Sequence, residues 1–338
     1  MKFNPIQKIY LICDTGALGD TISTFPILKL LAEKKQIERL FVSDRYVDLH
    51  KLVLPHEIIL PMAEVMKTVP REEVTPDIPS SVIDPRTGEA KFLDYPLLPN
   101  IPVIHSMSPH GLRPIRASLV DSFSATIAQT ILKEDEKDYP FVPKEKLPSN
   151  PLEGKKYAVI AYGATSDNRK MTVESFRAIK EYLLAKGYEV VLLGKRDHEL
   201  SLYAGGPLIK PDFSKLDTEG CIDYIDKTSI VESLSILNGA ALIAGVDGGL
   251  LHLAGMTDIP IVAGYTMVDP YYREIYRFGK RGYKFFAVEP DSECRFCQTN
   301  LLLTYGISFH ACGSRTFECV TSLTSDKWIT QIDRALNL

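Results

Sequence analysis

A carboxylate at the start of a helix is the first feature of this chain that could do chemistry. A strand-like apolar run at residues 8–13 leads into a glycine-containing turn that ends at Asp20, and an amphipathic helix is expected at 21–34. The helix dipole favours the ionised carboxylate, and the turn aims it at the carboxyl ends of the strands. Asp20 is therefore our candidate general base, with an ordinary first-turn acid as the alternative. A dinucleotide loop is excluded because Asp20 would repel the pyrophosphate.

A second turn of the same kind lies in the other half of the chain. Residues 240–246 are a continuous apolar run, and Asp247, Gly248 and Gly249 separate it from a helix expected to begin at Leu250. Two glycines let the backbone approach a ligand closely, and the N–H groups of a helix start favour a phosphate. The turn predicts a nucleotide cradle, with an ordinary turn capped by Asp247 as the alternative. His252 would support the phosphate end or pack beneath the helix.

Four of the six cysteines crowd into a short region near the C-terminus. Cys294, Cys297, Cys312 and Cys319 follow the pattern C-x2-C-x14-C-x6-C, which suits a tetrahedral site of four thiolates. We predict one structural zinc or iron ion that orders the loop at 293–320, with four unlinked thiols as the alternative. Because the other two cysteines stand alone, the chain is not a disulfide scaffold, and we expect a reducing compartment.

Basic residues outside the two turns offer further sites for anions. Arg113 and Arg116 lie in an irregular, proline-rich stretch that should wrap the first domain or border a binding mouth, so they are our candidates for holding an acceptor. A solvated loop with scattered charge is the alternative. A second basic patch consists of Arg277, Lys280, Arg281 and Lys284.

The composition is that of a soluble globular protein, with 45% hydrophobic and 24% charged residues among 338. The net charge of −4 argues against general binding of nucleic acid. No apolar run approaches the roughly 20 residues that span a bilayer, and the run at 9–13 is too short for the core of a signal peptide. We therefore expect a cytoplasmic protein with no transmembrane segment and no nucleic-acid partner.

Strand and helix signals alternate in both halves of the chain. A βαβ unit is expected at 157–161, 172–186 and 188–193, and a capping box at Ser229 and Glu232 opens another helix. We predict an α/β protein of two Rossmann-like domains that face each other across a cleft, where Asp20 and Asp247 both lie. The expected divisions are a first domain at 1–140, a proline-rich linker at 141–154, a second domain at 155–320 and a C-terminal helix at 321–338.

With these residues placed, the chain resembles glycosyltransferase family 9, the heptosyltransferases that use ADP-heptose, over nearly its whole length. The resemblance rests on four motifs in order, which are Leu18-Gly19-Asp20 with residues 24–28, Arg169-Lys170-Met171-Thr172 with Phe176, the stretch 247–254, and the loop from Gly264 to Asp269-Pro270. Related transferases that glycosylate autotransporter proteins are similar in their four-cysteine metal finger. The resemblance implies a glycosyltransferase with the GT-B architecture of two Rossmann-like domains.

The same resemblance implies roles for single residues. Asp20 corresponds to the catalytic base, a basic residue at 169 or 170 would touch the donor diphosphate, and Asp223 falls where relatives bind the ribose. The implied donor-binding set is Arg169, Lys170, Asp223, Asp247, Gly248, Gly249 and His252. The implied donor is a nucleotide-diphosphate sugar, with an ADP-sugar that carries a heptose favoured.

The residues also indicate how the transfer would proceed. The chain has no Asp-x-Asp sequence to hold a metal–diphosphate clamp, so basic residues and a helix start must balance the diphosphate charge and no catalytic metal is expected. A base without a candidate covalent partner predicts inversion at the anomeric carbon. The chain departs from the family at three places. The family has a basic residue where this chain has Asp14, a Trp-Pro pair at Met171-Thr172, and Ser or Thr at Gly248. These departures leave the identity of the donor sugar open.

Other functions stay open at this point. A non-catalytic nucleotide-sugar-binding or assembly subunit, with the cysteine loop mediating oligomerisation, is suggested by the altered motif positions. A sugar-nucleotide epimerase of similar architecture matches fewer motifs. The acceptor is a glycan or a protein hydroxyl, and a homo-oligomer and peripheral attachment to the inner membrane face are further options.

Overall fold

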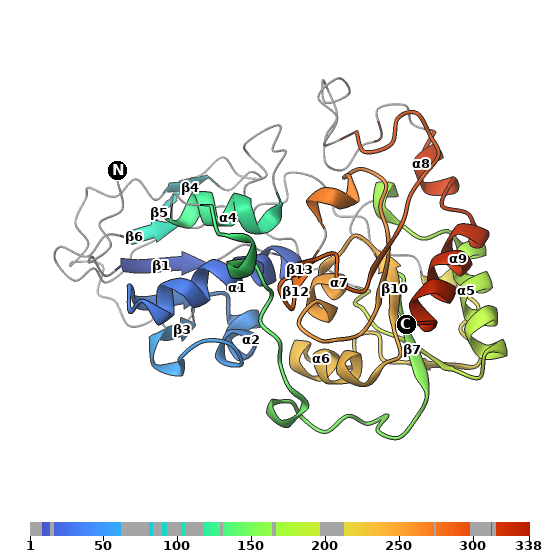
Figure 1. Ribbon diagram of the computed structural model, residues 1–338, viewed down its shortest axis with the longest axis horizontal. Helices are drawn as coiled ribbons and strands as arrows, with labels where there is room; N and C mark the ends of the chain where they lie inside the picture. Colours follow the sequence, from blue (N-terminus) through green and yellow to red (C-terminus); the bar gives the residue numbers. More distant parts are fainter. Residues whose placement is uncertain are drawn as a thin grey trace.

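Two parallel β-sheets, one in each half of the chain, organise this protein (Figure 1). The computed structural model describes residues 9–13, 17–61, 81–83, 90–92, 103–105, 118–128, 131–163, 167–196, 213–273, 275–297, 312 and 316–338. In Figure 1 the N-terminal half lies on the left and the C-terminal half on the right, with α1 and α7 between the two sheets.

The N-terminal sheet has the strand order β3-β2-β1-β6, and its neighbouring strands pair in parallel. Its strands are β1 (Ile9–Cys13), β2 (Ile37–Val42), β3 (Ile59–Pro61) and β6 (Val103–His105). The helices of this half are α1 (Leu18–Glu33), α2 (Val47–Lys51) and α4 (Leu119–Ala128). A separate antiparallel pair joins β4 (Ser81–Ile83) to β5 (Ala90–Phe92). The strand β1 confirms the strand that the sequence predicts before the first helix.

The helix α1 differs from the amphipathic helix that the sequence predicts. Every residue from Gly19 to Leu28 is buried, including Asp20, Thr21 and Thr24. The reason is that α1 packs against α4 on one side and against α7 of the other half on another. A helix enclosed in this way cannot keep a polar face in water, so its hydroxyl groups bond to carbonyl oxygens of its own preceding turn.

The C-terminal sheet has the order β14-β11-β10-β7-β8-β9 and is also parallel throughout. Its strands are β7 (Tyr157–Ala161), β8 (Glu189–Leu192), β9 (Cys221–Asp223), β10 (Ile243–Val246), β11 (Ile261–Gly264) and β14 (Phe285–Val288). Its helices are α5 (Val173–Ala185), α6 (Ile230–Gly239), α7 (Gly249–Ala254), α8 (Glu318–Thr321) and α9 (Ser325–Leu336). A short hairpin pairs β12 (Tyr276–Arg277) with β13 (Lys280–Arg281). The predicted βαβ unit is confirmed by β7, α5 and β8.

Local capping signals explain where several helices begin. The Thr172 side chain accepts a hydrogen bond from the Ser175 N–H and starts α5. Ser229 and Glu232 form the predicted capping box at α6, in which each side chain accepts from the other residue's N–H. These short-range signals are readable in the sequence because they involve residues three positions apart.

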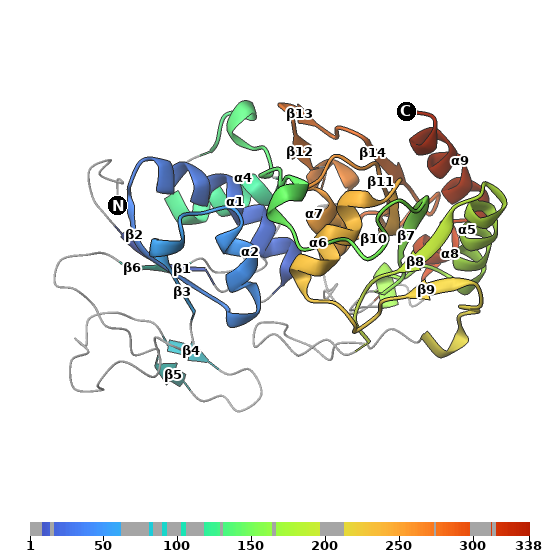
Figure 2. The same ribbon diagram turned by 90° about the horizontal axis from the view of Figure 1, so that it is seen from below.

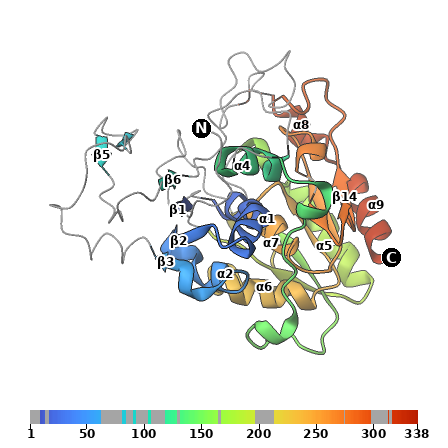
Figure 3. The ribbon, with the colours of Figure 1, turned by 60° about the vertical axis from the view of Figure 1, so that its left-hand side comes forward.

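The hydrophobic core is not divided at the boundary between the two halves. One cluster of buried residues continues from Leu11 and Phe25 of the first half to Leu251 and Ile243 of the second. A second cluster, which includes the fully buried Trp328, lies where α5 and α9 pack together. Figure 2 shows these two helices side by side. Figure 3 shows α1 beside α7 and α2 beside α6, which are the contacts that carry the first cluster across.

The segment predicted to be an interdomain linker is packed rather than loose. The Val142 N–H donates to the Met256 carbonyl at 3.0 Å, and the Ser235 hydroxyl donates to the Pro148 carbonyl at 2.7 Å. Its prolines remove N–H groups from the backbone, so the remaining polar groups bond to neighbouring elements instead of forming a helix or strand. Among the described residues, no helix combines the length and apolarity needed to cross a bilayer. The domain boundaries and the cytoplasmic location stay predictions.

Candidate functional site

Asp20 lies in the first turn of α1, at the end of the helix that faces the other half. Because α1 begins at Leu18, earlier than predicted, the Asp20 carboxylate stands among helix N–H groups whose dipoles favour its ionised form. The residue is only 7% exposed. Burying a carboxylate is costly unless its charge is compensated, so this position fits a site residue better than a surface acid.

The two glycine turns meet directly, although more than half of the chain separates them. A Cβ on Gly19 would lie 2.7 Å from Cδ2 of His252, and a Cβ on Gly249 would lie 2.8 Å from Cβ of Leu18. Both distances are too short for a real side chain, so the glycines are what allow α1 and α7 to touch. The glycine pattern predicts that a ligand approaches Gly249 closely, whereas in the structure the approaching group is Leu18.

Tyr139 is the residue at this junction that sequence reasoning missed. Its hydroxyl lies 2.8 Å from Nδ1 of His252 and 2.8 Å from Oγ of Ser23, and its ring stacks on the imidazole with centroids 6.0 Å apart. Burial raises the pKa of the Tyr139 hydroxyl well above its ordinary value. The only available signal was an aromatic residue at the edge of a proline-rich stretch, which is too common to single it out.

Asp247 is held between two arginines after the end of β10. The Asp247 carboxylate lies 3.6 Å from a guanidinium nitrogen of Arg169 and 4.0 Å from Nε of Arg273. All three side chains are largely buried. Arg273 was not predicted, although it follows the Asp269-Pro270 loop that carries part of the family resemblance. The guanidinium groups of Arg169 and Arg273 beside Asp247 are of the type that binds an anionic ligand.

Thr266 connects Arg169 to the cysteine-rich region. The Thr266 hydroxyl donates to the Asn168 carbonyl, which fixes the short helical turn Asp167–Arg169 against the end of β11. The Thr266 carbonyl in turn accepts a hydrogen bond of 2.7 Å from the Phe296 N–H. Thr266 therefore contacts both the turn that carries Arg169 and the loop that begins with Cys294.

Other predicted donor residues are not all brought to this junction. Lys170 is exposed and lies over the ring of Phe317 at 6.0 Å. Asp223 lies on the edge strand β9, separated from β10 by β7 and β8, where it pairs with Lys227 and Arg196. Its contact with a ribose stays a prediction. The predicted acceptor residues Arg113 and Arg116 lie outside the described residues.

The basic patch proposed from the sequence is not an anion site in this structure. The Arg277 guanidinium is buried and donates to the carbonyl oxygens of Thr257 and Ile259, both at 2.9 Å. Burial lowers the pKa of Arg277 to about 10. Lys284 pairs with Asp258 at 2.8 Å. Arg277 and Lys284 therefore stabilise the segments next to β11 and β14. Their closeness in the sequence suggested a common anion site, but in the structure both bond to protein groups.

At the predicted cysteine site, three of the thiols lie within electrostatic reach of the fourth, Cys319. The pKa of the Cys319 thiol is raised to about 12, first by burial and then by the nearby thiols of Cys294, Cys297 and Cys312. Within the described residues, however, no group of three or more possible ligands is arranged to hold a metal ion. The metal site therefore stays a prediction. Four thiolates are a suitable set of ligands for it.

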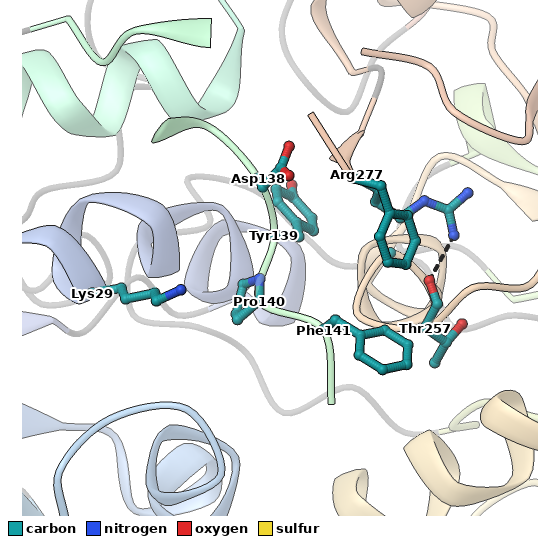
Figure 4. A pocket seen from close by; sticks show the side chains of 9 residues that line it. Lys29, Asp138, Tyr139, Pro140, Phe141, Thr257 and Arg277 are labelled. Atoms are coloured by element: carbon teal, nitrogen blue, oxygen red, sulfur yellow. Dashed lines mark hydrogen bonds between the residues drawn. The ribbon is translucent and has the colours of Figure 1, made fainter. Parts of the chain in front are cut away.

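A cavity of about 180 Å³ lies beside the segment that connects the two halves (Figure 4). Figure 4 shows Lys29, Pro140 and Phe141 on one side of it and Arg277 and Thr257 on the other. Tyr139 lines this cavity as well as bonding to His252. None of Asp20, Arg169 and Asp247 lines it, so the cavity borders the junction at Tyr139 without including the carboxylates.

Comparison with known proteins points to one family of sugar transferases. Residues 122–282 match the model of glycosyltransferase family 9, described as heptosyltransferases. The chain resembles glycosyltransferase family 9. Lipooligosaccharide heptosyltransferase 2 of Haemophilus influenzae is 26% identical over 97 residues, which cover 29% of this chain and 27% of that protein. These matches support a glycosyltransferase, and the aligned stretch spans about a quarter of that relative's length.

Solved heptosyltransferase structures share the fold. The iron-containing dodecameric glycosyltransferase TibC from enterotoxigenic E. coli superposes with a TM-score of 0.63 at 18% identity, covering 98% of this chain and 77% of TibC. E. coli ADP-heptose LPS heptosyltransferase II gives 0.57 at 15% identity, covering 98% and 99%. The predicted GT-B architecture of two α/β halves is therefore confirmed.

Proposed function

We propose that this chain is an inverting glycosyltransferase that moves a sugar from a nucleotide-diphosphate donor to a hydroxyl group of a glycan or a protein. The observation that carries the proposal is the junction of α1 and α7, where the buried Asp20 carboxylate stands beside His252 and near the arginines that flank Asp247. A base and a cationic site at the facing ends of two sheets are the two parts that such a transfer needs.

Asp20 would act as the general base. It takes the proton of the acceptor hydroxyl while the acceptor oxygen forms a bond to the anomeric carbon and the bond from that carbon to the diphosphate oxygen breaks. The electron pair of the broken bond leaves with the diphosphate. Because one displacement occurs on the face opposite the leaving group, the anomeric configuration is inverted.

Arg169 and Arg273 would balance the charge of the departing diphosphate. A guanidinium can donate two parallel hydrogen bonds to a phosphate and stays charged at any pH that the fold tolerates. Two such groups beside one carboxylate supply the positive field that a metal supplies in other transferases, which supports a metal-independent reaction. Lys170 and Asp223 belong to the proposed donor site on the strength of the resemblance alone.

An ADP-sugar with a heptose is the favoured donor. The matched family is described as heptosyltransferases, and a structure of TibC holds ADP-D-β-D-heptose. The departures at Met171 and Gly248 lie within the donor-side motifs, and the one at Asp14 precedes the Asp20 loop. A related sugar or nucleotide is therefore the natural variation to test. Parallel assays with ADP-, GDP- and UDP-sugars would identify it.

The cysteine loop would hold one structural metal ion. Cys294, Cys297, Cys312 and Cys319 would be its ligands, and zinc or iron is the metal that four thiolates prefer. Bound there, the metal would order the loop whose first residues bond to Thr266. Elemental analysis of protein purified without added metal tests this, and the absence of a stoichiometric metal would exclude the site.

The replacement Asp20→Asn tests the proposed base most directly. It keeps the size of the side chain and removes its ability to accept a proton, so we expect kcat to fall by about 10²- to 10⁴-fold while ADP affinity changes little. Asp48→Asn, at an exposed position on α2, is the matched control and should leave kcat unchanged. NMR of the product's anomeric proton reports inversion.

The outcomes separate the competing functions. Turnover by the wild type that persists undiminished in Asp20→Asn would remove Asp20 as the base. Tight binding of a nucleotide sugar with no turnover by the wild type, in the presence of any candidate acceptor, would favour the non-catalytic subunit instead. Activity that is lost with EDTA and restored by a divalent metal would contradict a metal-independent reaction.

A further inference from the structure

The hydrogen bonds around Tyr139 form a chain with a defined direction. The Ser23 hydroxyl donates to the Gly19 carbonyl oxygen at 2.9 Å. A serine hydroxyl has one proton, so Oγ of Ser23 can only accept at its 2.8 Å contact with the Tyr139 hydroxyl. Tyr139 therefore donates to Ser23, and its own single proton is used there.

The direction continues to His252. Because the Tyr139 proton points to Ser23, the tyrosine oxygen must accept at its 2.8 Å contact with Nδ1 of His252. Nδ1 therefore carries a proton. Burial lowers the pKa of His252 to about 4, although Asp247 and Asp20 act in the opposite direction, so the ring is neutral near pH 7. A neutral imidazole has one N–H, which leaves Nε2 as an acceptor.

The Nε2 atom faces the start of α1. A Cβ on Gly19 would lie 3.3 Å from Nε2, so the glycine lets the backbone at the start of α1 approach this edge of the imidazole. Asp20 follows at the next position of the same turn. Nδ1 is the ring nitrogen that bonds to Tyr139, so Nε2 is the ring nitrogen that can accept a hydrogen bond from a ligand.

We propose that Tyr139 is a positioning residue that holds His252 in the Nδ1-protonated tautomer, so that Nε2 accepts a hydrogen bond from a sugar hydroxyl and does not bind a phosphate oxygen. An ionised phosphate oxygen has no proton to give and would be repelled by the lone pair. The identity of the ligand as a sugar rests on the proposed function. The tautomer itself follows from the hydrogen bonds alone.

Tyr139 also makes this arrangement depend on both halves of the protein. Ser23 belongs to α1, His252 belongs to α7, and Tyr139 lies on the segment between them, where its N–H donates to the Tyr276 carbonyl at 2.9 Å. The ring is buried and stacked on the imidazole. The tautomer of His252 therefore reports whether α1, α7 and the connecting segment are together.

NMR of protein labelled with 15N at histidine tests the tautomer without any ligand. The wild type should show a protonated Nδ1 and an unprotonated Nε2 for the ring whose signals disappear in His252→Gln. In Tyr139→Phe, Nδ1 loses its acceptor, and in Ser23→Ala the tyrosine proton becomes available to Nδ1, so both variants should raise the Nε2-protonated fraction. A wild-type ring protonated at Nε2 would overturn the proposal.

Kinetics with ADP-D-β-D-heptose test the consequence. Tyr139→Phe should lower kcat by about tenfold, the effect of misplacing one hydrogen bond, while the affinity for ADP alone stays within about twofold. Tyr157→Phe is the matched control, because its buried hydroxyl also bonds to two groups, the Asn150 side chain and the Ile236 carbonyl, away from His252. It should lose similar stability and keep both kcat and the tautomer.

The outcomes keep this proposal separate from the proposed function. If the wild type turns over no nucleotide sugar, the transferase proposal fails, and the NMR result still decides the tautomer. If Tyr139→Phe weakens ADP binding as much as it lowers kcat, Nε2 serves the phosphate end and the hydroxyl assignment is wrong. An unchanged tautomer in both Tyr139→Phe and Ser23→Ala would reduce Tyr139 to a packing residue.

Discussion

The junction between α1 and α7 and the outer cluster between α5 and α9 are both buried, but different kinds of side chain fill them. The junction holds Asp20, Tyr139 and His252, which are polar and at most 7% exposed. The outer cluster is built around Trp328, Phe176 and other apolar side chains. Buried polar groups stabilise a fold less than apolar ones of the same size, so their presence at the junction indicates a use other than stability.

A glycine allows close packing in both regions, but the ring that it admits is apolar in the outer cluster and polar at the junction. A Cβ on Gly264 would lie 2.6 Å from the Trp328 ring, so this glycine admits the largest apolar side chain of the outer cluster. A Cβ on Gly19 would lie 2.7 Å from the His252 ring, so that glycine admits a polar ring instead. The absence of a side chain thus allows apolar packing in one region and a contact between polar site residues in the other.

Trp328→Ala should have the largest effect on stability, and it tests whether the outer cluster is purely structural. Removing a fully buried indole should lower the free energy of unfolding by about 3–5 kcal/mol, measured by denaturant titration. Nucleotide affinity of the folded fraction should stay at the wild-type value. A loss of affinity well beyond the unfolded fraction would mean that the two regions are coupled.

Arg169→Ala should weaken ligand binding at the junction more than it lowers the stability of the fold. We expect diphosphate binding, measured by calorimetry with ADP, to weaken by about 2 kcal/mol, the scale of a lost charged hydrogen bond. Lys170→Ala is the neighbouring control and should have a smaller effect because Lys170 is exposed and directed over Phe317. Equal losses from both variants would show that the geometry around Asp247 does not select Arg169.

Gly19→Ala tests the contact between the two turns. Alanine favours a helix over glycine, yet its Cβ would overlap the His252 ring, so we expect a net loss of about 1–2 kcal/mol in unfolding free energy together with reduced activity. Gly248→Ala is the control for unfolding free energy alone, since its Cβ would meet nothing closer than 3.4 Å and its backbone is extended. A stable and active Gly19→Ala would mean that α1 and α7 separate easily.

The smallest effect should appear in the pH dependence of stability. Burial lowers the pKa of both His252 and His50 to about 4, against an ordinary value of 6.5 for histidine. Between these values the unfolded chain binds protons that the folded chain does not, so stability falls as the pH drops from about 6.5 toward 4 and is unaffected above that range.

Each histidine should contribute up to about 1.4 kcal/mol per pH unit in that window. His50→Gln and His252→Gln should each flatten the curve of unfolding free energy between pH 6 and about 5. Trp328→Phe should lower the curve without changing its slope. A wild-type slope retained in both histidine variants would show that other groups dominate, and it would weaken the argument for a neutral His252.

Much of the fold could be predicted from the sequence because the signals are local. Apolar runs mark β1, β7 and β10, and the Ser229 capping box marks the start of α6. Asp20 and Asp247 could be placed at strand-to-helix turns by the same reasoning. Parallel strands then place such turns at one edge of each sheet, which is why the two aspartates could be assigned to one site.

The tertiary structure alone decided what those turns contact. Tyr139 meets His252 and Ser23 from far along the chain, and Arg273 reaches Asp247 from the loop after β11. Periodicity predicts that a side chain is buried but not which distant partner it meets, because that depends on how two separately formed sheets pack. The amphipathic pattern expected for α1 failed for the same reason, since both of its sides are covered by helices that lie far away in the sequence.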